Sequence, residues 1–249
     1  MNKKNRYGNS PISVTINNNN AEIFELLMEY AFKNNVIVEL EKNINANFIN
    51  DDNTEMVKLY LKYANKNVIL LNLNGKDKNK NYPLLKTIYN NNIELVELLM
   101  EYANKNNIIL ELNEKNIYGY YPLLKAINNN NIEMIKLLME YADKNNIILE
   151  MNEKDMDGNY PIFEAININN IEIVELLMEY ANKNNIILKL NEKNIYGDYP
   201  ILKAIYKNNN EIVELLLKYA HCNNIILELN IEYGYKRRLA LEFIKKCNR

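Results

Sequence analysis

The sequence predicts an all-α fold in which helix-turn-helix repeats with extended loop tips stack side by side. Two features recur with a period of 39 residues. One is a proline, at Pro83, Pro122, Pro161 and Pro200. The other is a Tyr-Ala pair, whose tyrosines are Tyr30, Tyr63, Tyr102, Tyr141, Tyr180 and Tyr219 and whose last five copies keep the period. A fixed period of this size is typical of a stack of small units, each of which buries its apolar face only against its neighbours.

Residues 113–151 illustrate one repeat. Pro122 favours the start of a short helix over 122–127, because proline at the first helical position has its φ already set and loses no hydrogen bond. The asparagines at 128–131 predict a break, since asparagine accepts a left-handed backbone more readily than most residues. A second helix is expected from Ile132 to about Lys144, with an acidic residue in its first turn and a basic one in its last.

After the second helix, Asn145 and Asn146 are expected to cap its end. The apolar run 147–151 is expected to lie extended. A polar tip then follows over 152–158, where Gly158 can adopt a positive φ. About a fifth of the chain, 51 of 249 residues, is asparagine. Because these asparagines recur at fixed phases between apolar positions, we interpret them as part of a packed repeat and not as a low-complexity segment.

The pattern resembles the ankyrin repeat, in which a T-P-L-H-x-A signature precedes two antiparallel helices. The corresponding segments read Tyr-Pro-Leu-Leu-Lys-Ala at 121–126, Tyr-Pro-Ile-Phe-Glu-Ala at 160–165 and Tyr-Pro-Ile-Leu-Lys-Ala at 199–204. A glycine two residues before the Tyr-Pro pair also matches, at Gly119, Gly158 and Gly197. The resemblance implies an ankyrin-type solenoid.

Departures from the ankyrin pattern are systematic. Tyrosine replaces its threonine, and leucine or phenylalanine replaces its histidine. We therefore expect apolar packing to replace the hydrogen bonds that these two residues make between ankyrin units. The glycine that ends the second ankyrin helix is a tyrosine here, so that this helix is expected to run on by roughly a turn.

We expect the whole chain, 1–249, to form a single array of about six repeats. The repeat at about 41–73 is degenerate, because it is six residues shorter and has neither the proline nor the glycine of the tip. An irregular or truncated first helix is expected there. The end units are expected to act as caps, including a C-terminal capping helix at about 236–246, because terminal repeats meet water on one side.

Composition excludes several classes of protein. With 30 basic and 32 acidic residues, the chain has no electrostatic footprint for nucleic acid. It has two cysteines, no apolar run long enough to span a membrane and no signal-peptide pattern. We therefore expect an intracellular, cytoplasmic monomer that binds neither nucleic acid nor membrane.

No catalytic motif is present, and we predict no enzyme activity, cofactor or metal. His221 and Cys222 are neighbours, but two potential ligands do not make the four of a structural zinc site.

The resemblance to ankyrin repeats implies a non-catalytic scaffold or adaptor that binds a protein on a concave face. That face is built from the tips and the exposed sides of the first helices. Candidate contacts are the positions where the copies differ. At the tips these are Tyr118, Tyr120, Asp157, Asn159, Tyr196 and Asp198, and on the first helices they are Lys86, Lys125, Glu164 and Lys203. Tyrosine is enriched at interface hot spots, so that Tyr118, Tyr120 and Tyr196 are the expected anchors. The same tyrosines could instead stack one tip on the next.

Two alternative functions remain open. Residues 153–164 fit the frame of a calcium loop, with Glu153, Asp155, Asp157 and Glu164 as ligands and Gly158 at the turn. However, the first position is Glu instead of Asp, and the sister repeats lack the carboxylates. The second alternative is an RNA-binding helical repeat protein, in which a few variable side chains per repeat read one base.

Overall fold

The computed structural model describes residues 1–40, 49 and 53–228, and these contain eleven α-helices. The chain divides into two compact units, residues 1–111 and 112–249. The prediction that the whole chain forms one continuous array stays a prediction.

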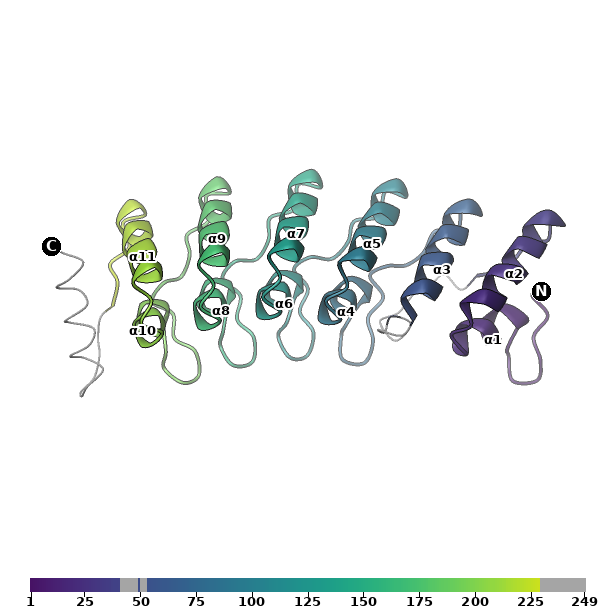
Figure 1. The fold of residues 1–249 in the computed structure, drawn as a ribbon, viewed down its shortest axis with the longest axis horizontal. Coiled ribbons are helices and arrows are strands. Elements are labelled where there is room, and N and C mark those ends of the chain that lie inside the picture. Colours follow the sequence, from purple (N-terminus) through teal and green to yellow (C-terminus); the bar gives the residue numbers. More distant parts are fainter. Residues whose placement is uncertain (41–48, 50–52, 229–249) are drawn as a thin grey trace. The chain divides into compact units, whose positions relative to one another are not determined.

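The first unit contains five helices (Figure 1). They are α1 (Pro11–Asn17), α2 (Ala21–Lys33), α3 (Thr54–Lys66), α4 (Pro83–Tyr89) and α5 (Ile93–Lys105). The pairs α1–α2 and α4–α5 form helical hairpins, and the longer helices α2, α3 and α5 pack in succession. The degenerate repeat contributes α3. Its expected irregular first helix falls mainly on residues 41–48 and 50–52, which lie outside the described part of the chain.

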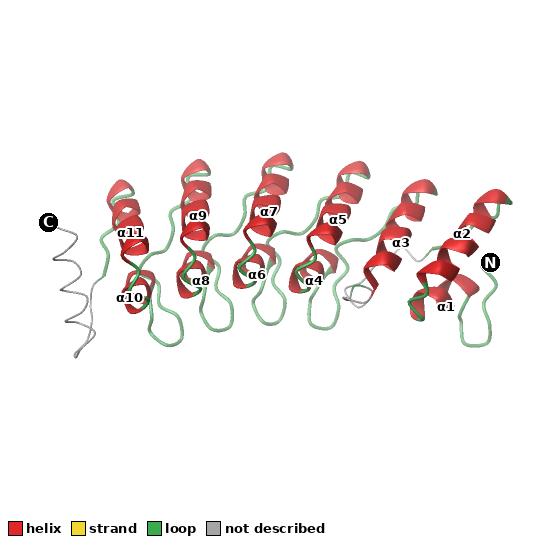
Figure 2. Ribbon diagram, viewed as in Figure 1, coloured by secondary structure: helices red, strands yellow, loops and turns green. Residues whose placement is uncertain are grey.

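The second unit contains three hairpins of the same design (Figure 2). The short first helices are α6 (Pro122–Asn128), α8 (Pro161–Asn167) and α10 (Pro200–Tyr206). The longer second helices are α7 (Ile132–Lys144), α9 (Ile171–Lys183) and α11 (Asn210–Cys222). First helix packs on first helix and second on second, so that the apolar faces form one core within the unit. The expected capping helix at 236–246 lies outside the described residues.

Local chemistry explains why each element begins and ends where it does. Proline occupies the first turn of each of the five short helices. Asn131 caps the second helix, because its side-chain oxygen accepts a hydrogen bond from the Met134 N–H. The preceding Asn130 has a φ of 54°, which provides the predicted left-handed turn between the helices. After α7, Asn145 closes the helix and Asn146, with a φ of 55°, turns the chain into the return segment.

The segment that follows each second helix returns to the next tip without forming a regular strand in the described residues. It packs against the following repeat. In the second unit, the Tyr180 hydroxyl accepts a hydrogen bond from the Leu149 N–H, and the Tyr219 hydroxyl accepts one from the Leu188 N–H. The tyrosine of the Tyr-Ala pair therefore joins its repeat to the one before. This role accounts for its presence at the same position of each repeat.

One expectation about the joints between repeats is wrong. The tyrosine that replaces the ankyrin threonine is indeed buried, but it does not act by apolar packing alone. The Tyr160 hydroxyl donates a hydrogen bond to the main-chain oxygen of Lys189 at 2.6 Å and lies 3.0 Å from that of Glu192. The Tyr121 hydroxyl reaches Glu153 O at 3.2 Å. Burial raises the pKa of both phenols, so that each stays a hydrogen-bond donor.

The first repeat, which is expected to act as a cap, exposes large apolar side chains. Its helix α2 exposes Leu26, Tyr30 and Phe32, and Tyr30 is 59% exposed. The equivalent tyrosine of α5, Tyr102, is buried against the preceding repeat. The first repeat thus exposes apolar side chains at positions such as Tyr30, where the equivalent Tyr102 is buried.

Candidate protein-binding surface

Each loop tip is shaped by one asparagine or aspartate. Asn116 Oδ1 accepts hydrogen bonds from the Tyr118 and Tyr120 N–H groups, both at 3.0 Å. Asp155 and Asn194 bind the corresponding main-chain groups of the next two tips. Such side chains hold a turn that would otherwise leave main-chain donors unpaired. Each tip is therefore held in the same turn by hydrogen bonds to one side chain.

Neighbouring tips of the second unit are joined through their main chains. The Met156 N–H donates to Tyr118 O at 3.2 Å, and the Ile195 N–H donates to Asp157 O at 3.0 Å. Gly119 makes this close approach possible. It has a φ of 82°, and a Cβ atom added to it would lie 2.6 Å from Asp155 Cα. The predicted positive φ at the tip glycine is confirmed. Close contact with the next tip is a second reason why glycine is needed at Gly119.

This arrangement places a row of large apolar side chains on three consecutive tips. Tyr118 is 50% exposed, Met156 68% and Tyr196 73%. We call the exposed set at this edge the tip row, and it consists of Ile117, Tyr118, Met156, Ile195 and Tyr196. Sequence reasoning chose the two tyrosines and missed the other three. These three share one phase of the repeat, directly before that of the tyrosines, so that comparing hydrophobicity at each tip position could have found them.

Of the other predicted tip residues, Asp157 is exposed next to Met156, whereas the remaining three lie on what we call the inner flank, the side of the tips that contacts their own repeat. Tyr120, Asn159 and Asp198 are all half-buried. Lys125 Nζ lies 5.6 Å from the centre of the Tyr120 ring, a cation–π contact. Lys203 Nζ lies 3.8 Å from the Asp198 carboxylate. These residues are less available to a partner than the tip row, because part of their surface already contacts their own repeat.

The lysines of the first helices are half-buried as well. Lys125 Nζ donates to Asn128 Oδ1 at 3.1 Å, and burial lowers its pKa while the nearby Glu164 opposes that shift. Lys86 of α4 occupies the equivalent position in the first unit. Each lysine therefore combines a packed aliphatic stem with a charged end at the surface.

Glu164 does not lie where the sequence analysis expected it. The pattern of the first helices predicts an exposed position here, but Glu164 is only 6% exposed. Its carboxylate accepts hydrogen bonds from Asn128 Nδ2 of the preceding repeat at 3.1 Å and from Asn167 Nδ2 at 3.3 Å. A buried carboxylate needs such donors. Glu164 is therefore a structural residue between α6 and α8.

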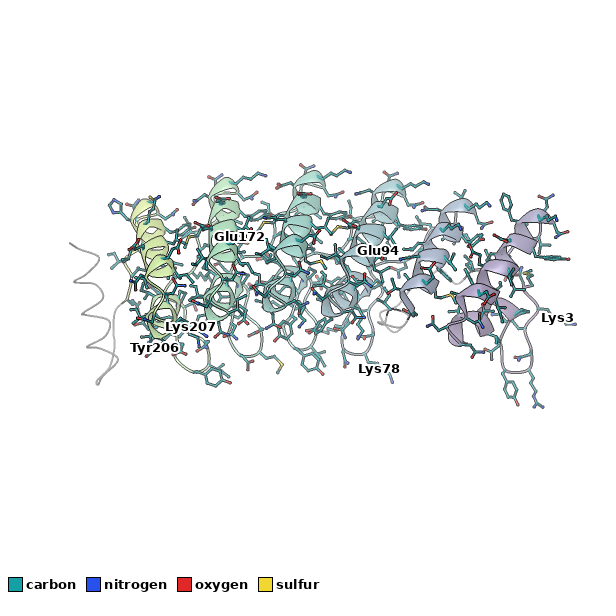
Figure 3. The ribbon with its side chains drawn as sticks, viewed as in Figure 1. Lys3, Lys78, Glu94, Glu172, Tyr206 and Lys207 are labelled. Carbon is teal, nitrogen blue, oxygen red and sulfur yellow. The ribbon has the colours of Figure 1, made fainter. Side chains whose placement is uncertain are left out.

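The first unit has a different tip. Figure 3 shows Lys78 on the loop that precedes α4, and Lys78, Asn79 and Lys80 are all exposed. Asp77 Oδ1 holds this turn through the Asn79 and Asn81 N–H groups, both at 2.8 Å. The turn is the same, but the side chains it displays are polar.

The proposed calcium ligands do not converge. Glu153 pairs with Lys115 Nζ at 2.7 Å, and this contact lowers the pKa of Glu153. Asp155 binds two N–H groups of its own turn, and Glu164 is held by two asparagines. Among the described residues, no group of three or more His, Cys, Asp and Glu side chains is arranged to hold a metal ion.

The second helices present a charged face on the other side of the hairpins. Figure 3 shows Glu94 and Glu172 in the first turns of α5 and α9. In the first unit, Lys58 Nζ lies 2.7 Å from Glu94, and in the second unit Lys136 Nζ lies 3.0 Å from Glu172. Exposed pairs of this kind contribute about 0–1 kcal/mol each. They link neighbouring repeats.

No helix in the described ranges has both the length and the apolar character that crossing a membrane requires.

Comparison with known families agrees with the geometry. The family model for ankyrin repeats in three copies matches residues 44–148 and 145–226, which is more than half of the chain. A comparison with curated proteins found no match. The match covers the repeats whose hairpins, tip turns and left-handed asparagines are described above. The chain therefore belongs to the ankyrin repeat family, whose repeats are generally protein–protein interaction modules and typically non-catalytic.

Proposed function

We propose that this protein is a non-catalytic scaffold or adaptor that binds a partner protein through the tip row of its second unit. The observation that carries the proposal is the exposure of Tyr118, Met156 and Tyr196 on three consecutive tips. A tyrosine and methionine surface suits protein recognition, because these side chains offer large contact areas and are enriched at interfaces.

Two further features support the choice of this surface. The main-chain bonds between tips hold the row in register before any partner arrives, which reduces the entropy lost on binding. The inner flank adds polar groups, with Lys125 and Lys203 beside it. A partner with apolar side chains at its centre and carboxylates at its edge would match this surface.

The other predicted contacts take different roles in this proposal. Tyr120, Asn159 and Asp198 would contribute at the edge of the interface, and Asp157 would contribute at its centre beside Met156. Lys86 belongs to the first unit and is not part of the tip row. Glu164 is omitted because its carboxylate is buried.

The test compares two variants of the intact chain in affinity capture with quantitative mass spectrometry. The first replaces Tyr118, Met156 and Tyr196 with alanine. The second replaces Ile148 and Ile187 with alanine, two exposed isoleucines on the return segments. Proteins that bind through the tip row should be lost from the first variant and retained by the second. Direct titration of a recovered partner should show a loss of at least tenfold in affinity for the first variant only.

Circular dichroism and thermal unfolding must show that both variants fold like the parent chain. If a partner binds the tip variant as tightly as the parent, the tip row is not the binding surface. Retention of an RNA oligonucleotide in a filter-binding assay at low salt would favour the RNA-binding alternative instead, since phosphate contacts are strongest there.

A further inference from the structure

Asn74 and Gly75 form the only Asn-Gly pair in the sequence. Asparagine before glycine is the pair most prone to spontaneous deamidation, because glycine has no side chain to hinder its own amide nitrogen from reaching the asparagine side chain. In the described chain, glycines with a left-handed backbone are Gly8, Gly119, Gly158 and Gly197. Gly75 is not among them, so that its backbone conformation does not explain why glycine stands there.

The side chain of Asn74 joins two neighbouring repeats. Its Nδ2 donates to Ile109 O at 2.7 Å, and its Oδ1 accepts from the Glu111 N–H at 3.2 Å. Both partners belong to the return segment of the next repeat. The side-chain amide therefore acts as an interrepeat clamp, binding two main-chain groups of its neighbour in the way that another peptide group would.

The same clamp recurs along the chain with different residues after it. Equivalent pairs of hydrogen bonds are made by Asn2, Asn113, Asn152 and Asn191. Lysine follows Asn2 and glutamate follows the other three. The five sites thus share one environment and differ in the residue that would carry out the attack.

We propose that Asn74 is a self-modification site at which deamidation irreversibly opens one interrepeat clamp. The Gly75 amide nitrogen loses its proton and attacks Asn74 Cγ. A bond forms between that nitrogen and Cγ, the Cγ–Nδ2 bond breaks, and Nδ2 leaves as ammonia after taking up a proton. Water then hydrolyses the cyclic imide at either carbonyl, which yields aspartate or isoaspartate. No oxidant or further reactant is needed.

The clamp and the reaction compete for the same side chain. While Asn74 binds Ile109 O and the Glu111 N–H, its amide is held across the repeat boundary and cannot turn toward the Gly75 nitrogen. Reaction therefore requires local opening of this joint. Once the product has formed, a carboxylate faces the Ile109 carbonyl oxygen in place of a donor, so that the clamp cannot close again. The extent of conversion records how often the joint has opened.

The experiment incubates the intact chain at neutral and at mildly alkaline pH and follows each asparagine by peptide mass spectrometry. Conversion is expected at Asn74 well ahead of Asn113, Asn152 and Asn191, and it should be faster at the higher pH, where the attacking nitrogen is more readily deprotonated. In urea it should be faster still, because the clamp is absent. The variant Gly75→Glu, which copies the sister repeats, should remove the preference for Asn74.

A second measurement tests the structural consequence. Asn74→Asp should unfold at a lower urea concentration than the parent chain, while Gly75→Glu should not. Conversion of Asn74 at the same rate as its sister asparagines would overturn the proposal. So would a folded chain that stays unmodified over a period in which the unfolded chain is fully converted, or an Asn74→Asp variant with an unchanged midpoint.

Discussion

Asn152 holds the return segment of the next repeat at two points, Ile187 and Lys189. Its Nδ2 donates to Ile187 O at 2.9 Å, and its Oδ1 accepts from the Lys189 N–H at 3.0 Å. The two groups lie two residues apart on the same edge of a roughly extended segment, so that a single amide reaches both. Asparagine is the residue that fits, because it carries one donor group and one acceptor on a short side chain.

Asn152→Ala should destabilise the protein by about 0.5–1.5 kcal/mol, because both main-chain groups of the next repeat lose their partner while water partly replaces it. Urea denaturation measures the change. Asn182 is the control, since it is exposed on α9 and alanine favours a helix. Asn182→Ala should leave the midpoint unchanged or raise it slightly. A loss at Asn182 as large as that at Asn152 would contradict the clamp.

Tyr160→Phe should cost about 1–3 kcal/mol, because it removes the buried donor that faces Lys189 O and Glu192 O. The packing of the ring is retained, so that the loss reports on the hydroxyl group. Tyr196→Phe serves as the matched control, because Tyr196 is exposed at a tip and its hydroxyl is free to bind water. The thermal midpoint should fall for Tyr160→Phe and stay unchanged for Tyr196→Phe. Equal midpoints would mean that Tyr160 stabilises the fold by apolar packing alone.

Gly119→Ala should destabilise the second unit more than Gly197→Ala. Both glycines have a φ near 80°, at 82° and 78°, so that alanine is strained by about 1–2 kcal/mol at either position. At Gly119 the new Cβ would also collide with the next tip, at Asp155 Cα, whereas at Gly197 no atom of the described residues lies within 4 Å of it. The difference between the two unfolding midpoints isolates the contact between tips. If the two variants are destabilised equally, the neighbouring tip can move away from the added methyl group at no cost in stability, and the contact between tips is not tight.

Asp155→Asn should stabilise the protein at neutral pH, and the gain should disappear in acid. Burial raises the pKa of Asp155 above its ordinary value of 3.8, although hydrogen bonds from the Asn159 and Asp157 N–H groups oppose this shift. A raised folded-state pKa means that the wild-type carboxyl loses stability as the pH rises through that value. Below the unfolded-state pKa it is neutral in both states, and asparagine then offers no advantage.

Urea unfolding of Asp155→Asn and the parent chain, measured from acid to neutral pH, tests the direction of this stability difference. Glu153 provides the opposite case, because Lys115 lowers its pKa, so that its contribution is present above the unfolded-state pKa and is lost as the pH falls. Glu153→Gln should therefore lower the stability at neutral pH and remove the part of the acid-induced loss that Glu153 causes. An advantage of Asp155→Asn that grows in acid would contradict the assignment.

Sequence reasoning predicted the helices closely. The second helix was expected from Ile132 to about Lys144 and spans those residues, and the first helix ends one residue beyond the expected 127. These predictions succeed because proline, the asparagine turn and the apolar period act locally. Among the candidate site residues, Tyr118 and Tyr196 are exposed as expected, whereas Glu164 is buried. Its burial depends on Asn128 of another repeat, which a pattern within one repeat does not reveal.

The sequence by itself determined the repeat, its helices, its turns and its family, because these follow from residue types at fixed spacings of 39 or fewer. The tertiary structure decided what the asparagines and tyrosines do, since the partners of Asn152 and Tyr160 lie 29 to 37 residues away on the next repeat. It also decided which tip side chains reach the surface. Exposure depends on how closely one tip approaches the next, and glycines such as Gly119 permit that approach.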